Sequence, residues 1–282
     1  MTTHVYINNL SVALPNAVVN NNQMEQILGK VGGVKSRARA VILRSNGIKQ
    51  RYYAIDPETG KQNYTNAELA AQAVRSLFVD NSEMHDIDTL VASSSIPDQL
   101  MPNHASMVHG ELNNPPCEVV STSGVCLCGV TALKYAYLNI KAGESTKSVV
   151  VASELASAMM HARNFEAERQ HKLDSLAQNP ELAFEKDFLR WMLSDGAGAA
   201  LLTNQPNPVG ISLRLDWIDT VSFANELEAC MYAGAEKIDG KDYIWLYPTQ
   251  RCIIYCDGIG WTTVGLGRWQ TLAKGVIVYV DH

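Results

Sequence analysis

Residues 117–142 read CEVVSTSGVCLCGVTALKYAYLNIKA, and this stretch decides the fold. Two adjacent valines follow the Pro115-Pro116 pair, and they predict a strand over residues 117–122. A helix is expected over residues 125–142, because Gly143 closes a segment rich in alanine and leucine. A strand that leads directly into a helix is the building unit of an α/β fold.

The segments on either side continue the same alternation. Strands are predicted over residues 88–94, 148–153, 195–202 and 210–217, and a helix over residues 103–112. Asn103 follows Pro102 and is a suitable N-cap for that helix. The strand at 148–153 (SVVVAS) is apolar throughout, which is typical of a buried parallel strand. The alternation therefore predicts a parallel sheet with helices on its faces.

Length and composition limit the class of protein. The chain has 282 residues, enough for one large domain or two fused halves. Its net charge is −6 and it contains no run of five basic residues, so neither nucleic acid nor an anionic membrane surface is expected as a partner. The N-terminus lacks the basic and apolar regions of a signal peptide, and no apolar stretch approaches 18 residues. We therefore expect a cytoplasmic protein with reduced cysteines.

Two regions differ from this alternating pattern. Residues 159–192 are charged and interrupted by Asn179-Pro180, and they predict an insertion that lies over the sheet. The composition shifts near residue 250: three of the five tryptophans lie between 245 and 269, and four glycines lie between 258 and 267. No amphipathic helix is predicted there.

The cysteines are the candidate chemical groups. They stand at positions 117, 126, 128, 230, 252 and 256. Cys126 falls in the first turn of the predicted helix, where the positive end of the helix dipole lowers the pKa of a thiol and the unpaired N–H groups can hold an oxyanion. This pattern indicates a nucleophile for acyl transfer. The alternative is that Cys126 and Cys128 are small buried apolar residues.

Several further segments occur in an order that resembles a known family. They are Leu14-Pro15 with NNNQME at 20–25, RSNGIKQR at 44–51, Cys126 followed by Ala132-Leu133, Ser153-Glu154, and DGAGA at 195–199. From residue 14 to residue 237 the chain resembles a ketosynthase III-type (3-oxoacyl-ACP synthase III-like) condensing enzyme of the thiolase superfamily. The resemblance implies a thiolase-like αβαβα sandwich. Its first half would be complete over residues 1–205, and its second half would be incomplete over residues 206–282 and atypical after about 250.

The resemblance also implies roles for particular residues. Cys126 would be the nucleophile, with Cys128 as the second choice. Arg44 and Arg51 would grip the phosphates of coenzyme A; the alternative for both arginines is a solvated, ion-paired loop. The implied reaction is a Claisen-type condensation in a homodimer, with an acyl group from coenzyme A or acyl carrier protein and a malonyl- or β-ketoacyl-carrier as second substrate. Residues 97–112, 121–126 and 230–237 further resemble ketosynthases of dialkylresorcinol and aryl-polyene pathways.

The sequence departs from the family at one point. Such enzymes use a Cys-His-Asn triad, yet the only histidine after His171 is His282. A frameshifted or prematurely ended chain would explain the departure, and we then expect little condensing activity. Two alternatives therefore stay open: a non-catalytic remnant or partner subunit that folds and dimerises, and an acyltransferase that needs only Cys126.

The sequence predicts no metal site and no permanently bound cofactor. His104 and His109 are five residues apart on one predicted helix, so they do not share a face. His161 and His171 are expected in solvent within the charged insertion. Cys252 and Cys256 have no second pair of ligands with metal-site spacing.

Overall fold

The computed structural model describes residues 3–165, 188–222 and 224–225, and the backbone of five further strands between residues 231 and 272. The strands are β1 (Val5–Ala13), β2 (Val19–Asn20), β3 (Gln50–Arg51), β4 (Thr89–Ser93), β5 (Glu118–Thr122), β6 (Lys147–Glu154), β7 (Gly196–Thr203), β8 (Leu213–Leu215), β9 (Met231–Ile238), β10 (Lys241–Pro248), β11 (Arg251–Cys256), β12 (Gly260–Gly265) and β13 (Thr271–Leu272). The α-helices of the described ranges include α1 (Met24–Ile27), α2 (Arg39–Asn46), α3 (Asn66–Arg75), α4 (His104–Leu112), α5 (Cys128–Ala142) and α6 (Ala156–Met160). Two 3₁₀ helices span Val31–Gly33 and Asn81–Asp86.

The main sheet has six strands in the order β5-β4-β6-β7-β1-β8. Strands β5, β4 and β6 are parallel to one another, as the sequence predicts. Strand β7 is antiparallel to both β6 and β1, and β8 is antiparallel to β1. The sheet is therefore mixed rather than wholly parallel: β1 runs in the same direction as β5, β4 and β6, whereas β7 and β8 run in the opposite direction.

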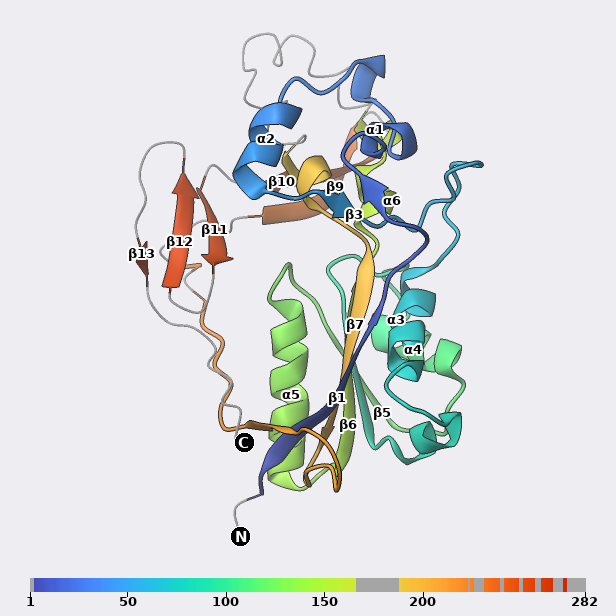
Figure 1. The fold of residues 1–282 in the computed structure, drawn as a ribbon, viewed down its shortest axis with the longest axis vertical. Coiled ribbons are helices and arrows are strands. Elements are labelled where there is room, and N and C mark those ends of the chain that lie inside the picture. Colours follow the sequence, from blue (N-terminus) through green and yellow to red (C-terminus); the bar gives the residue numbers. More distant parts are fainter. Residues whose placement is uncertain are drawn as a thin grey trace.

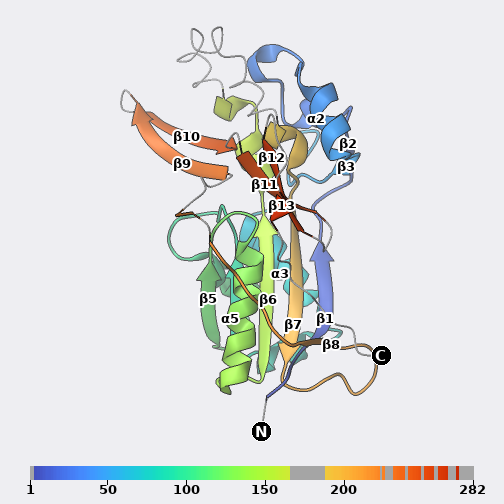
Figure 2. The same ribbon diagram turned by 90° about the vertical axis from the view of Figure 1, so that its left-hand side faces the viewer.

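Helices cover the two faces of this sheet. Figure 1 shows α3 and α4 on one face and α5 on the other, and Figure 2 shows α5 lying along β5 and β6. The α3 and α4 face buries alanines of α3 together with Leu90, Val149 and Val151. The α5 face buries Ala132, Ala136 and Ile140. Helix, sheet and helix thus form three successive layers around two apolar cores.

The boundaries of the covering helices follow from local hydrogen bonds. Asn103 caps α4, accepting a hydrogen bond from the Ser106 N–H at 2.9 Å, as predicted. Thr65 and Glu68 form a capping box at the start of α3. Helix α5 ends at Gly143, which has φ +85° and so occupies the left-handed region that favours glycine.

Strand β1 is a long strand of the main sheet that sequence patterning misses. Its sequence, VYINNLSVA, contains two adjacent asparagines that break the alternation of apolar residues. The pairing with β7 is irregular between Ile7 and Asn9, so a bulge at Asn8 absorbs one residue. The Asn8 side chain donates to Thr203 Oγ1 at 2.7 Å, and Asn9 donates to the Leu77 carbonyl at 2.5 Å. The two asparagine side chains therefore bond β1 to β7 and to the segment that follows α3.

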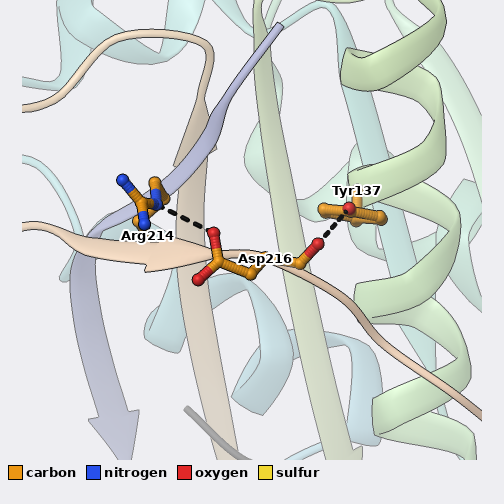
Figure 3. A network of polar contacts seen from close by, with 3 residues as sticks. All are labelled: Tyr137, Arg214 and Asp216. Carbon is orange, nitrogen blue, oxygen red and sulfur yellow. Dashed lines mark hydrogen bonds and ion pairs between the residues drawn. The ribbon is translucent and has the colours of Figure 1, made fainter. Parts of the chain in front are cut away.

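The chain after β7 passes back across α5. Figure 3 shows Asp216 between Arg214, whose Nε donates to the Asp216 carboxylate at 2.8 Å, and Tyr137, whose hydroxyl donates to the Asp216 backbone oxygen at 2.8 Å. Lys134 of α5 lies 3.7 Å from the Asp219 carboxylate. The strand predicted over 210–217 is only three residues long, because Asp216 and the residues after it turn onto α5.

A third apolar cluster packs the short helices α1, α2 and α6 together. Met24, Leu28 and Ile42 pack with Met160, Phe165, Leu189 and Trp191, which come from the two described ends of the segment 159–192. The two described ends of that segment are therefore part of a core. His161 is half-buried rather than solvated, and burial lowers its pKa. His171 lies outside the described residues.

The later strands form two separate small sheets. Strands β9 and β10 are an antiparallel hairpin, and β11, β12 and β13 form an antiparallel sheet. The atypical region after residue 250 thus contains strands. None of the helices in the described ranges combines the length and apolar character needed to cross a bilayer.

Candidate active site

The site begins in the exposed turn of residues 123–127, called here the Cys126 turn, which joins β5 to α5. Gly124 has φ +120°, a conformation that strongly favours glycine, and it redirects the chain as it leaves β5. The Cys128 N–H then donates to the Val125 carbonyl at 3.2 Å, and Thr131 N–H donates to the Leu127 carbonyl at 3.0 Å. Helix α5 therefore begins at Cys128, three residues later than the sequence predicts. Cys126 lies just before the first turn and is exposed.

The second candidate thiol has a different environment. Cys128 is the first residue of α5 and is only 7% exposed. Burial raises the pKa of its thiol, and the Glu154 carboxylate raises it further. Hydrogen bonds with the Ser93 hydroxyl, the Gly129 N–H and the Ser95 hydroxyl lower the pKa but do not cancel the rise. Of the two thiols, Cys126 is therefore the accessible one.

Polar side chains from the ends of β4 and β6 lie beneath the Cys126 turn. The Glu154 carboxylate accepts hydrogen bonds from the Ser95 N–H and, at 3.3 Å, from the Ser94 hydroxyl. The Ser95 hydroxyl donates to the Gly124 carbonyl at 3.3 Å. Ser95 therefore links the Glu154 carboxylate to the Cys126 turn by hydrogen bonds. Parallel strands bring their carboxyl ends to the same edge, which explains why residues about 30 and 60 positions apart meet here.

Two buried side chains lie beside this network. Asn66 is fully buried and donates to the Ser94 hydroxyl at 2.8 Å, while its side-chain oxygen has no hydrogen-bond partner. His104 Nε2 lies 3.0 Å from the Ser153 hydroxyl, and its Nδ1 has no partner. Burial lowers the His104 pKa, which favours the neutral ring. Neither residue was singled out for the site from sequence, because their burial depends on how α3 and α4 pack.

The two arginines proposed for coenzyme A lie in different environments. Arg44 is exposed in the last turn of α2, where it stays a candidate for binding phosphate. Arg51 is 1% exposed, and it donates to Asn21 Oδ1 at 2.7 Å and to the Trp191 carbonyl at 2.8 Å. Its guanidinium also lies 5.8 Å from the centre of the Trp191 ring. In this structure Arg51 therefore binds other parts of the chain, and the alternative of a solvated arginine does not hold for it.

Other residues named from the sequence lie elsewhere. Cys117 is half-buried at the start of β5, and burial raises its pKa. The side chains of Cys230, Cys252, Cys256 and His282 lie outside the described residues. Ser94 and Ser95 were not singled out, and only their position directly after a predicted strand would have pointed to them.

A glycine on α5, Gly129, lies where the helix closely approaches β6. A Cβ atom at Gly129 would lie 3.2 Å from the Ala152 Cβ. Gly129→Val is therefore expected to lower the free energy of unfolding by about 1–3 kcal/mol through overpacking. Gly110→Ala in α4 is the matched control, because nothing lies within 4 Å of its added Cβ. That variant should be more stable by about 0.5–1 kcal/mol. Urea unfolding followed by circular dichroism tests both; equal stabilities would contradict the close approach.

Comparisons with known proteins show what this chain is similar to in sequence and in fold. No protein-family model matches the chain. The chain is 28% identical over 161 residues to the β-ketoacyl-[acyl-carrier-protein] synthase III of Cereibacter sphaeroides, which covers 57% of this chain and 46% of that protein. It thus spans about half the length of the curated relatives that it matches.

Solved structures agree on the fold. A tetronic acid condensing enzyme matches with a TM-score of 0.62 at 20% identity, over 86% of this chain and 67% of that one. An OleA variant from Xanthomonas campestris matches with a TM-score of 0.55 at 22% identity, over 71% and 58% of the two chains. The chain therefore has the thiolase-like α/β fold of condensing enzymes, as predicted. Its sequence similarity is to β-ketoacyl-[acyl-carrier-protein] synthases III.

Proposed function

We propose that this protein is a 3-oxoacyl-ACP synthase III-like acyltransferase in which Cys126 carries the acyl group. The observation that supports this most is the exposed Cys126 in the turn between β5 and the N-terminus of α5. The positive end of the helix favours a thiolate there, and helix N–H groups can stabilise an oxyanion. Sequence similarity to β-ketoacyl-[acyl-carrier-protein] synthases III supports this reaction class.

The proposed reaction has two steps. The Cys126 thiolate attacks the carbonyl carbon of an acyl thioester of coenzyme A or acyl carrier protein; a new S–C bond forms, the donor C–S bond breaks, and the carrier leaves as a thiol after taking a proton. A malonyl thioester then loses carbon dioxide, or a β-ketoacyl thioester loses a proton, and the resulting carbanion attacks the acyl-Cys126 carbonyl. A C–C bond forms and Cys126 leaves as thiolate. The product would enter fatty acid, polyketide or alkylresorcinol synthesis.

A second candidate function is acyl loading without condensation. Between residues 172 and 282 the sequence contains a single histidine, His282, and the His104 ring is buried against Ser153. Condensation needs donors that stabilise the enolate of the second thioester, and loss of one such donor typically costs on the order of 10²–10³ in rate. A chain that loads and holds acyl groups would act as a partner subunit.

Intact-mass analysis separates these functions. The protein is incubated with a panel of acyl-CoA and acyl carrier protein thioesters, and then with malonyl or β-ketoacyl carriers. A mass increase equal to one acyl group supports loading. Its disappearance together with formation of the β-keto product supports condensation, whereas a stable acyl-protein supports the second candidate. No mass increase with any donor contradicts both.

A homodimer is also proposed, paired through β5. This strand ends the order of the six-stranded sheet, and β4 is its only neighbour among the described strands. An open strand edge favours pairing with another chain. Multi-angle light scattering over a dilution series is expected to give twice the 30.9 kDa mass of the chain at micromolar concentration. A monomer at every concentration would contradict the pairing.

A further inference from the structure

Two cysteines lie on either side of the start of α5, and the helix alone does not choose between them. Cys126 lies in the turn before the helix and Cys128 is its first residue. Both positions are within one turn of the positive end of the helix dipole, where a thiolate is stabilised. Burial already disfavours the thiolate form of Cys128, and a second feature of the structure acts in the same direction.

The structure connects a carboxylate to one of these thiols through Ser95. The Ser95 N–H donates to the carboxylate of Glu154, the last residue of β6, and the Ser95 hydroxyl lies within hydrogen-bonding reach of the Cys128 thiol, which is only 7% exposed. Burial is the main cause that raises the pKa of the Cys128 thiol, and the Glu154 carboxylate raises it further. The carboxylate is held in place by the Ser95 N–H and by the Ser94 hydroxyl at 3.3 Å. A negative charge next to a buried thiol disfavours its thiolate form. The same Ser95 extends in the other direction to the Gly124 carbonyl of the Cys126 turn, at 3.3 Å.

We propose that Glu154 is a selectivity residue that keeps Cys128 a neutral thiol and leaves Cys126 as the cysteine that carries the acyl group. This proposal depends on the proposed function only in naming an acyl group as the group that Cys126 carries. The physical effect itself concerns the relative reactivity of two thiols. Glu154 acts through Cys128 and through Ser95, so it is a positioning residue and touches no reacting atom.

Alkylation by iodoacetamide tests this without an acyl donor. Peptide mapping gives the labelling rates of Cys126 and Cys128 separately at pH 7–8. In the wild type Cys126 should react first. Glu154→Gln keeps the size and one acceptor oxygen but removes the charge, so the ratio of Cys128 to Cys126 labelling should rise about three- to tenfold, since each unit of pKa changes the thiolate fraction tenfold. Glu154→Asp, which keeps the charge, should restore most of the wild-type ratio.

Glu118→Gln is the matched control. Glu118 is the first residue of β5, at the opposite end of the parallel strands, where its carboxylate bonds to Thr89, Tyr135 and Asn139. Removing that charge should leave the ratio unchanged. An unchanged ratio in a folded Glu154→Gln protein overturns the role of Glu154.

Two further outcomes separate this proposal from the proposed function. First labelling of Cys128 in the wild type would overturn both the selectivity proposal and Cys126 as nucleophile, whereas absence of acyl loading with normal alkylation selectivity would overturn the acyltransferase function alone. If Glu154→Gln does not fold, the wild-type labelling rates from pH 6 to pH 10 decide: the Cys128 rate should rise at higher pH than the Cys126 rate. Coincident profiles would overturn the proposal.

Discussion

Cys126→Ala is expected to abolish acyl loading, with the rate of mass increase falling by about 10³-fold or more, as loss of a nucleophile does in other covalent catalysts. The exposed Cys126 is the accessible thiol at the start of α5, and alanine removes the atom that would form the thioester. Intact-mass analysis with the reactive donors from the thioester panel gives the loading rate. The fold should be retained, because an exposed turn residue contributes little to either core.

Cys128→Ala and Cys117→Ala are the matched controls, since each removes one thiol whose pKa is raised by burial above the ordinary thiol value. Both variants should load the acyl group at close to the wild-type rate. Loading that persists in Cys126→Ala and disappears in Cys128→Ala would move the nucleophile to Cys128. Loading that persists in all three variants would place it outside the described residues, where the side chains of Cys230, Cys252 and Cys256 lie.

Local sequence patterns predicted the parts of the fold that local interactions determine. The strands β4, β5 and β6 and the helix α4 lie within one residue of their predicted ends, because apolar runs, the Asn103 cap and the proline pair act over a few residues. Strand β1 was missed because a bulge replaces the expected alternation. The start of α5 was placed too early because it depends on the backbone angle of Gly124.

The site was predictable only in part for a similar reason. Cys126 is the candidate nucleophile that the strand-to-helix pattern indicates and that the resemblance implies from the spacing to Ala132-Leu133; it stays a prediction, and the structure shows that it is exposed. The contacts of Glu154 with Ser94 and Ser95 join residues about 60 positions apart, so no local pattern reports them. The burial of Arg51 likewise depends on Trp191, 140 residues away, although the sequence around Arg51 resembles a phosphate-binding segment.

Asp195→Ala is expected to produce the largest loss of stability, about 2–4 kcal/mol in the free energy of unfolding. Asp195 is 2% exposed, and its carboxylate accepts hydrogen bonds from the Ala54 N–H at 2.7 Å, from the Ser157 N–H at 2.7 Å and from the Ser157 hydroxyl at 2.5 Å. Alanine would leave three buried donors without an acceptor. Asp216→Ala is the control, because its side chain is an exposed partner of Arg214 and such pairs contribute about 0–1 kcal/mol. Equal losses of unfolding free energy for the two variants, measured by urea unfolding, would contradict the stabilising role of the three hydrogen bonds to Asp195.

The same carboxyl predicts a pH dependence with a definite sign. Burial raises the pKa of Asp195 above its ordinary value of 3.8, although the bonds from Ala54 and Ser157 oppose the shift. The folded protein therefore binds this proton more tightly than the unfolded chain does. The contribution of this tighter proton binding to the free energy of unfolding is fully present below pH 3.8. It is lost as the pH rises through the raised pKa of Asp195 in the folded state. Asp195→Asn does not titrate, so subtracting its unfolding free energy from that of the wild type at each pH isolates the effect. We expect this difference to fall as the pH rises above 3.8; a difference that increases with pH would show that the hydrogen bonds outweigh burial and that Asp195 is stabilised as the carboxylate.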